Sequence, residues 1–310
     1  MTTSLIRKLT RYLTDNVYRF DVNTKLGLHD CLSDEEFLSK LCKLKLGYEL
    51  CLDNPTKFNE KIQWLKIYDR KPEYTIMADK FLVKDFVKER IGEQYIIQTI
   101  GVWEHFDEID FDELPSQFVL KCTHDSGSII IVKDREEFAQ IKEKVKTKIE
   151  KKLRKNYYYH TREWCYKNIH PRIIAEPYLQ NDSEEEMVDY KFMCFNGKVR
   201  CSFVCSERFS EDGLKVTFFD REWNRMPFER HYPRSKRFLP KPQKYSEMIT
   251  LAEELAKDIP FIRVDFYEIN GKVYFGELTL YPGSGFEEFC PREWDETLGT
   301  WISLPRKGIL

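Results

Sequence analysis

FIRVDFYEINGKVYFGELTLYPGSG, Phe261 to Gly285, contains two segments rich in Val, Ile, Phe and Tyr on either side of the pair Asn270-Gly271. An Asn-Gly pair between two such segments is the strongest short-range signal for a β-hairpin. A Pro-Gly-Ser-Gly turn follows the second segment and ends at Gly285. The run therefore predicts two antiparallel strands closed by a tight turn, and the other segments are interpreted by their relation to this hairpin.

Charged side chains are few on these two strands. Arg263 and Asp265 lie on the first strand, and Glu277 lies on the second. Acids on adjacent strands can hold a hard cation between them, and Mg²⁺ prefers one or two carboxylates completed by the phosphate oxygens of a nucleotide. The pattern is typical of a magnesium site; a surface hairpin with solvated acids is the alternative.

The metal hypothesis makes a prediction about strand register. A strict two-residue turn pairs Ile269 with Lys272. The register that follows sets Asp265 opposite Gly276 and sends Glu277 to the other face of the sheet. Only an odd offset, from a three-residue loop or a bulge at Gly276, brings the two acids to one face. A metal site therefore requires that offset.

A second candidate site lies between two short apolar segments, residues 118–121 and 129–132. Lys121 ends the first segment and can offer its ammonium to a phosphate group. The polar loop between the segments ends in residues whose backbone N–H groups can surround the same phosphate: Ser126, Gly127 and Ser128. The segments read as strands around a phosphate loop, although the loop lacks the GK[ST] ending of a P-loop.

A second Asn-Gly turn, Asn196-Gly197, predicts another hairpin from residue 189 to residue 205. Lys191 lies on its first strand and Arg208 just beyond its second strand, where both side chains can face phosphates. Both residues are therefore candidate nucleotide contacts.

Taken together, these motifs resemble ATP-grasp enzymes. R-x-D, the Asn-Gly turn, E-x-T and the Pro-Gly turn look like the metal-binding hairpin of that superfamily. The runs NPTKFNEKIQWLKIYDR, DYKFMCFNGK and FGELTLYPGSG are similar to its TupA-like branch, named after teichuronopeptide biosynthesis. The resemblance covers most of the chain from about Asn54 onward. It implies an α+β ATP-grasp fold with a helical N-terminal region, a nucleotide held between two α/β subdomains, and ATP and Mg²⁺ as cofactors.

The resemblance also implies roles for single residues. Asp265, Glu277 and Thr279 become metal ligands, with Thr279 in the place where many members have an Asn ligand to a second metal. Arg263 and Lys121 become catalytic groups. Nucleotide contacts are implied for Lys80, which resembles the first lysine of the superfamily, for the phosphate loop, and for an adenine pocket formed by Glu176, Tyr178 and Leu179.

The resemblance suggests three regions, a helical one over residues 1–78, a central subdomain over 79–178 and a C-terminal subdomain over 179–310. In the first, Ser33 and Glu36 form a capping-box pattern before an apolar helix. Residues 5–13 show helical apolar spacing and predict another packing helix. Their basic residues also permit a helix that binds a partner or a membrane surface: Arg7, Lys8 and Arg11.

Composition excludes several classes of function. The 310 residues contain 50 basic and 52 acidic side chains, a net charge of -2, which does not favour nucleic acid as a partner. No run approaches the ~20 apolar residues of a membrane span, and the N-terminus lacks the continuous apolar core of a secretory signal. Nine Cys without paired CxxC spacing indicate reduced thiols. We expect a cytoplasmic protein.

Two further sequence patterns each allow a functional and a structural interpretation. The segment around Tyr157 to Tyr166 is rich in aromatic residues and includes Arg162, a combination that suits a sugar ring bearing a carboxylate; core or lid packing is the alternative. Asp110 and Asp112 form a D-x-D pattern, which binds the metal of a sugar nucleotide in many glycosyltransferases. Because an acidic linker surrounds them, we interpret them as a solvated turn.

The implied reaction is ATP-dependent joining of a carboxylate to an amine through an acyl phosphate. By family resemblance, the carboxylate belongs to a uronic acid or a sugar-nucleotide uronate, and the product enters bacterial surface polysaccharide. The alternatives are a glycosyltransferase of capsule or O-antigen assembly and a non-catalytic carbohydrate-binding protein on the same fold. The sequence does not predict the oligomeric state.

Overall fold

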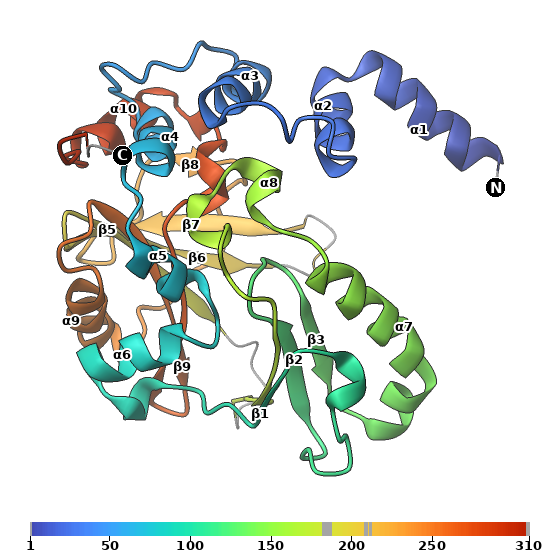
Figure 1. Cartoon of the computed structure of the whole chain (residues 1–310). Helices are drawn as coiled ribbons and strands as arrows, with labels where there is room; N and C mark the ends of the chain where they lie inside the picture. Colours follow the sequence, from blue (N-terminus) through green and yellow to red (C-terminus); the bar gives the residue numbers. More distant parts are fainter. Residues whose placement is uncertain (1, 182–187, 208–209, 211–212, 308–310) are drawn as a thin grey trace.

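The computed structural model describes residues 2–181, 188–207, 210 and 213–307 (Figure 1). Two antiparallel sheets organise these residues. The four-stranded sheet has the order β1-β4-β2-β3, with bounds Gly101–Trp103, Ile173–Pro177, Phe118–Cys122 and Ile129–Val132. The five-stranded sheet has the order β10-β9-β5-β6-β7, with bounds Lys272–Thr279, Phe261–Ile269, Asp189–Phe195, Lys198–Ser206 and Lys215–Phe219. A two-residue pair, β8 (Glu229–Arg230) and β11 (Phe289–Cys290), completes the strands.

The helices precede, connect and follow the sheets. They are α1 (Thr2–Thr14), α2 (Asn16–Lys25), α3 (Asp34–Leu46), α4 (Phe58–Tyr68), α5 (Pro72–Ala78), α6 (Val83–Ile91), α7 (Arg135–Leu153), α8 (Tyr158–Thr161), α9 (Tyr245–Leu255) and α10 (Glu293–Thr300). The capping box predicted before α3 is confirmed, since the Glu36 backbone N–H donates to Ser33 Oγ and the Ser33 N–H donates to Glu36 Oε2. None of the helices in the described part of the chain is long and apolar enough to cross a membrane.

Each sheet has its own hydrophobic core. Helix α7 packs against the four-stranded sheet, where Phe138 meets Phe118. Helices α4 to α6 and α9 share one core with the five-stranded sheet, so that Phe58 of α4 contacts Phe261 of β9. Figure 1 shows α9 and α7 on opposite sides of the molecule. The four-stranded sheet ends at residue 177 and the five-stranded sheet begins at 189, while the division at residues 78 and 178 stays a prediction.

The hairpin β9–β10 has the register that the metal hypothesis requires. Its turn is a two-residue one, with Ile269 opposite Lys272. The register then shifts between Phe275 and Glu277, so that Glu277 stands directly opposite Asp265. Gly276 is the extra residue of this bulge, and a Cβ there would lie 3.2 Å from the Asp265 carbonyl oxygen. The predicted offset is confirmed, and it arises from a bulge that bends the strand beside a cavity.

Helix α1 departs from the prediction. Its apolar residues were expected to pack, but Leu5, Ile6, Leu9 and Leu13 are between 61% and 71% exposed. Helix α1 contacts α2, where the Tyr12 hydroxyl donates to Asn23 Oδ1 at 2.8 Å, and Figure 1 shows it projecting from the body of the molecule. The packing prediction is therefore wrong for α1, although it is confirmed for α3, whose apolar face is buried.

Candidate active site

A cavity of about 290 Å³ lies between the two sheets. The four-stranded sheet contributes Lys121 and Glu176, and the five-stranded sheet contributes Lys191 and the hairpin acids. The turn between α5 and α6 adds Lys80. The structure therefore brings together, around one cavity, residues predicted from segments nearly 200 positions apart: Lys80, Lys121, Ser126, Gly127, Glu176, Lys191, Asp265 and Glu277.

Arg263 joins the two acids of the hairpin. Its Nε lies 2.7 Å from Asp265 Oδ1, and its Nη2 lies 2.7 Å from Asp265 Oδ2 and 3.0 Å from Glu277 Oε1. The Thr279 hydroxyl donates to the same Glu277 oxygen at 2.5 Å. Thr279 thus contacts a predicted metal ligand, while its own role as a ligand stays a prediction.

Lys191 of β5 completes this charge cluster. Its Nζ lies 2.5 Å from Asp265 Oδ2 and 2.5 Å from Asp189 Oδ2. Burial raises the pKa of the Asp265 carboxyl, but Arg263 and Lys191 outweigh it and hold that pKa below the usual range. Burial opposes the charged form of Lys191 as well, yet Asp265 keeps the pKa of the ammonium above its usual value. Asp265 is therefore an anion held in place by two cations.

The two hairpin acids differ in exposure, since Asp265 is 2% exposed and the Glu277 side chain 47%. No group of three or more His, Cys, Asp or Glu that could enclose a metal gathers among the described residues. Two carboxylates facing a cavity are the protein share expected for Mg²⁺, because that ion usually takes its other ligands from water and substrate phosphates. The donor set on this hairpin therefore fits Mg²⁺ bound together with a nucleotide.

Half-buried lysines form the opposite wall. Glu176 is 5% exposed and pairs with Lys121 and, at 2.6 Å, with Lys84 of α6. Burial raises the pKa of the Glu176 carboxyl, but Lys121 and Lys84 lower it by more. The pKa therefore lies below its usual value, and the carboxylate stays charged. Lys80 Nζ donates to the Cys122 carbonyl oxygen at 3.1 Å and to the Asp125 carbonyl oxygen, and burial lowers its pKa. The wall thus places the ammonium groups of Lys80, Lys84 and Lys121 along the cavity.

The phosphate loop connects β2 and β3. Ser126 and Gly127 line the cavity, and Gly127 has a φ of 85° that favours glycine. Ser128 points elsewhere: it is buried and its hydroxyl donates to Asp125 Oδ2, which Lys152 also approaches at 3.3 Å. Ser126 and Gly127 are therefore placed to contact a ligand, whereas the Ser128 side chain braces the loop.

Other predicted site residues lie apart from the cavity or beyond the description. Tyr178 and Leu179 are not among the residues that line it; Lys133 Nζ lies 5.1 Å from the centre of the Tyr178 ring instead. Their role in an adenine pocket stays a prediction. Arg208 lies outside the described residues. Asp110 and Asp112 are exposed, and the Asp112 N–H donates to Asp110 Oδ1 at 2.9 Å, which is the predicted turn.

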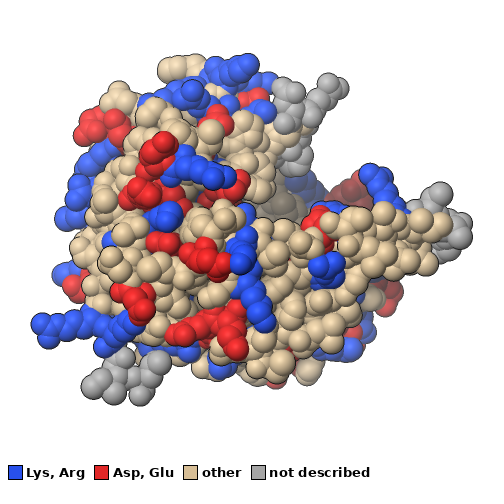
Figure 2. All heavy atoms as spheres, turned by 90° about the horizontal axis from the view of Figure 1, so that it is seen from above, with Lys and Arg blue, Asp and Glu red and all other residues tan. Residues whose placement is uncertain are grey.

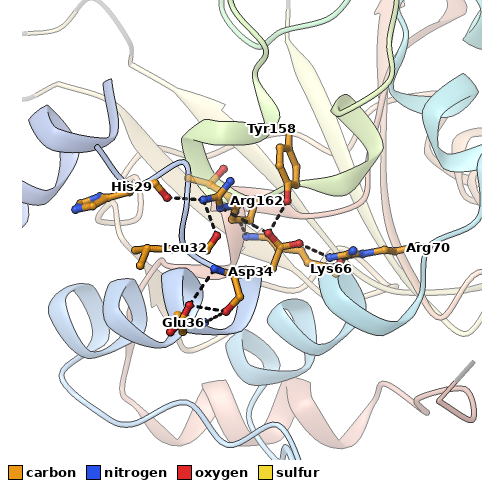
Figure 3. A network of polar contacts seen from close by, with 10 residues as sticks. His29, Leu32, Asp34, Glu36, Lys66, Arg70, Tyr158 and Arg162 are labelled. Carbon is orange, nitrogen blue, oxygen red and sulfur yellow. Dashed lines mark hydrogen bonds and ion pairs between the residues drawn. The ribbon is translucent and has the colours of Figure 1, made fainter. Parts of the chain in front are cut away.

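Arg162 belongs to the interior. Its Nη2 donates to the carbonyl oxygens of His29 at 2.7 Å and Leu32 at 3.2 Å, and its Nε lies 3.6 Å from Asp34 Oδ1 (Figure 3). Tyr158 donates to the same carboxylate at 2.5 Å. With 2% of its surface exposed, Arg162 ties α8 to the α2–α3 connection. For this residue the structure agrees with the packing alternative.

Sequence reasoning missed two sets of residues around the site. Lys84 has the spacing of a surface lysine on an amphipathic helix, and its position beside Glu176 depends on the tertiary fold. A polar face of α4 was missed as well. Gln63 Nε2 donates to the carbonyl oxygens of Ser284 at 3.0 Å and Gly285 at 2.8 Å, which belong to the turn after β10. Polar residues at helical spacing in NPTKFNEKIQWLKIYDR were the available signal.

Lys66 holds the same turn from one helical turn further along α4. Its Nζ donates to the carbonyl oxygens of Thr161 at 3.0 Å and Ser284 at 2.8 Å. Ser284 has a φ of 55°, a left-handed conformation that is unusual for a residue with a side chain. Burial lowers the pKa of Lys66 to about 8. Gln63 and Lys66, both 0% exposed, thereby fix a strained turn that follows the acid-bearing strand.

Several solved structures are similar to this chain over part of its length. The D-alanine–D-alanine ligase of Bacillus anthracis in complex with ATP is 17% identical, with a TM-score of 0.39 over 66% of this chain and 55% of that chain. The Helicobacter pylori D-alanine–D-alanine ligase is 15% identical, with a TM-score of 0.40 over 80% and 70%. The RimK domain ATP-grasp protein of Sphaerobacter thermophilus is 11% identical, with a TM-score of 0.41 over 76% and 70%.

The chain thus spans just over half of the Bacillus anthracis ligase. None of the curated proteins matches the sequence. Residues 60–303 match the family described as TupA-like ATPgrasp, which covers both sheets, the cavity between them and the polar face of α4. The α+β architecture with a helical N-terminal region agrees with this match. The chain belongs to the TupA-like ATP-grasp family.

Proposed function

We propose that this protein is an ATP-dependent carboxylate–amine ligase that works through an acyl phosphate. The observation that carries the proposal is the bulge at Gly276. It sets Asp265 and Glu277 on one face of the hairpin, across a cavity from Lys121 of the other sheet. Two acids for a metal and several ammonium groups for phosphates, all lining one cavity, match the needs of a bound triphosphate.

The proposed reaction has two steps. First, an oxygen of the substrate carboxylate attacks the γ-phosphorus of ATP, the bond to the β–γ bridging oxygen breaks, and ADP leaves. Second, the amine nitrogen attacks the acyl carbon, the C–N bond forms, the C–O bond to the phosphoryl group breaks, and phosphate and a proton are released. ATP is needed because a free carboxylate has no adequate leaving group.

The residues of the chain supply binding and charge in this scheme. Asp265 and Glu277 hold Mg²⁺, which neutralises phosphate charge when bound. Lys80, Lys121 and Lys191 bind phosphate oxygens, and the N–H groups of Ser126 and Gly127 cover them. Glu176 holds Lys121 at the cavity and Asp265 holds Lys191 there, whereas Lys80 is held by backbone carbonyl oxygens. Phosphate oxygens compete for the same ammonium protons.

Arg263 stabilises the negative charge that develops on the reacting oxygens, because its guanidinium is fixed by both hairpin acids. Glu176, Tyr178 and Leu179 contribute to the adenine pocket, and Arg208 contacts phosphate. These assignments follow the family pattern, as does Thr279 as a partner of the metal site.

We further propose a uronic acid or sugar-nucleotide uronate as the carboxylate substrate, with an amino acid or another amine as acceptor, in bacterial surface-polysaccharide assembly. The reaction takes place in the cytoplasm, where ATP is available. This choice of substrate rests on the TupA-like family and its link to teichuronopeptide. The glycosyltransferase alternative loses its candidate metal motif, because Asp110 and Asp112 form an exposed turn away from the cavity.

ADP release tests the proposal. The purified protein is incubated with ATP and Mg²⁺ and a panel of uronates, amino acids and UDP-sugars. We expect ADP and phosphate to form only when a uronate and an amine are both present, in equal amounts to a new amide detected by mass spectrometry. Transfer from a UDP-sugar without ATP would contradict the ligase function and support a glycosyltransferase.

A further inference from the structure

A second cavity, of about 560 Å³, lies on the other side of the phosphate loop. Asp125 and Ser126 line both cavities, so this short loop separates them. Tyr157 lines the second cavity and Tyr166 the first, and their rings meet edge to face with centroids 4.9 Å apart. The two cavities therefore share a wall of backbone and aromatic side chains.

The second cavity is basic and aromatic. Lysines reach it from the end of α2 and the end of α7, and aromatic side chains from the segment after α7: Lys25, Lys152, Lys155, Tyr157, Tyr159 and His160. Its acids are Asp30 and Asp125, and Asp125 already pairs with Lys152 at 3.3 Å. Lys25 and Lys155 are exposed at its rim. Aromatic faces suit the C–H surface of a sugar ring, and ammonium groups suit carboxylates.

We propose that this second cavity binds an anionic saccharide and presents one of its carboxylates across the phosphate loop to the nucleotide. The proposal deepens the ligase function and rests on it for the fate of the bound carboxylate. The open rim leaves room for further sugar units, so a uronate-bearing oligosaccharide fits better than a single small acid. The saccharide rings stack on Tyr159 and Tyr157, while Lys25 and Lys155 bind carboxylates along it.

Direct binding tests this site without turnover. The probe is trigalacturonate, with maltotriose as the neutral counterpart, titrated calorimetrically into the protein. We expect trigalacturonate to bind and maltotriose to bind at least tenfold more weakly. The double variant Lys25→Glu with Lys155→Glu should weaken trigalacturonate at least tenfold. The double variant Lys144→Glu with Lys148→Glu, which makes the same charge change at exposed positions of α7 outside the cavity, should change it less than twofold.

ADP release, measured beside trigalacturonate binding, separates the two proposals. If uronates support ADP release but the rim variants leave trigalacturonate affinity unchanged, the cavity proposal fails and the ligase function stands. If the rim variants weaken trigalacturonate but no uronate supports ADP release, the cavity proposal stands and the ligase function fails. Equal binding of the neutral and acidic trisaccharides overturns the cavity proposal.

Helix α1 carries an independent inference. Its exposed residues Leu5, Leu9 and Leu13 recur every four positions and form one stripe with Ile6. The opposite side of the helix carries Arg7 and Arg11, with Lys8 at one flank, and α1 contains no acid. In Figure 2 the arm that ends in the grey N-terminal atoms is largely uncharged on the visible face. An apolar stripe backed by basic residues is typical of a helix that lies in a membrane interface.

We infer that α1 binds the surface of an anionic lipid bilayer. Basic residues without acids complement anionic headgroups, and the leucine stripe enters the boundary between headgroups and acyl chains. Because α2 follows α1 directly and Lys25 at the end of α2 lines the second cavity, membrane binding would bring that cavity close to the lipid surface.

Vesicle flotation tests this inference with the full-length protein. We expect binding to vesicles of phosphatidylglycerol and phosphatidylcholine, at least tenfold weaker binding to phosphatidylcholine alone, and a tenfold loss in Leu5→Glu with Leu9→Glu. Thr10→Glu on the polar side serves as the matched control and should bind within threefold of wild type. If the leucine variants dissociate a dimer in sedimentation analysis, and vesicles bind neither protein, the helix joins two copies and the inference fails.

Discussion

The hairpin β9–β10 and the polar face of α4 both bury charged side chains, but the partners of those side chains differ. On the hairpin, Asp265 takes its N–H donors from the side chains of Arg263 and Lys191, and a cavity borders the group. On α4, Lys66 donates to backbone carbonyl oxygens and is not among the residues that line this cavity. Both arrangements satisfy a buried charge, as burial requires.

Asp265 and Lys66 differ in whether a ligand can replace their hydrogen-bond partners. A metal ion can take the place of Lys191 at Asp265, because both residues line the cavity. Nothing can replace the carbonyl oxygens around Lys66 without moving the turn that contains Ser284. Buried charge alone therefore does not mark a catalytic group. Substitutions on the hairpin should mainly change activity, and those on α4 should mainly change stability.

The largest expected effect is on the hairpin. Asp265→Asn keeps the shape of the side chain but removes the anion between Arg263 and the metal. We expect ADP release to fall by roughly 100- to 1000-fold, the range for loss of a preorganised charge. The same change at exposed Asp110 should leave ADP release within twofold of wild type. Equal losses in both variants would mean that the D-x-D turn, and not the hairpin alone, serves the reaction.

The next effect concerns α4. Lys66→Met fills the space of the side chain but leaves the carbonyl oxygen of Thr161 without a donor, while the Ser284 carbonyl keeps the Gln63 amide. We expect the free energy of unfolding to fall by about 2 kcal/mol, from one buried acceptor left unpaired. Urea denaturation measures it, with Lys40→Met on the surface of α3 as a control that should change by less than about 0.5 kcal/mol. A stable Lys66→Met protein that has lost all ADP release would place Lys66 in the reaction instead.

The pH dependence of the free energy of unfolding also tests the structural role of Lys66. The pKa of Lys66 is lowered to about 8 in the folded protein, so between pH 8 and pH 10.5 the unfolded chain binds more protons at this site than the folded one. Stability contributed by this group therefore rises with pH across that window, by at most about 3 kcal/mol. Urea denaturation at pH 7.5 and 9.5 should show the rise in wild type and a smaller one in Lys66→Met. Equal slopes in the two proteins would contradict the lowered pKa.

The smallest expected effect is at Thr279. Thr279→Val removes the hydroxyl that donates to Glu277 but keeps the shape of the residue. We expect ADP release to fall about fivefold to tenfold, since one hydrogen bond to a charged group is lost and Arg263 still holds Glu277. Thr279→Ser, which keeps the hydroxyl, should act as wild type. A loss as large as that of Asp265→Asn would make Thr279 a metal ligand in its own right.

Local sequence signals were sufficient for the hairpins. The turn residues Asn270-Gly271 and Asn196-Gly197 have positive φ, as two-residue hairpin turns require, and the strands follow from the β-branched and aromatic runs beside them. The register condition on Asp265 and Glu277 was predictable because side chains alternate along a strand. The sequence named Gly276 as a possible bulge but left a three-residue loop open, and the structure has the bulge, where a Cβ would lie 3.2 Å from the Asp265 carbonyl oxygen.

Long-range contacts account for what the sequence did not show. Lys66 and Lys84 have the helical spacing of surface lysines, and only the packing of α4 and α6 against distant segments buries them. Arg162 lies in a run of aromatic residues that suits a sugar, but its partners belong to a loop 130 positions earlier. Helix α1 has an apolar stripe that predicts burial, and whether another element covers it depends on the tertiary fold.

Binding of a non-hydrolysable ATP analogue tests the central claim most directly, namely that Asp265 and Glu277 converge with Lys121 of the other sheet on one metal-bound triphosphate. Calorimetric titrations would be run with and without Mg²⁺ on wild type and on the double variant Asp265→Asn with Glu277→Gln. We predict that Mg²⁺ strengthens binding to wild type at least 100-fold and barely changes binding to the double variant. The same Mg²⁺ dependence in both proteins would contradict the account.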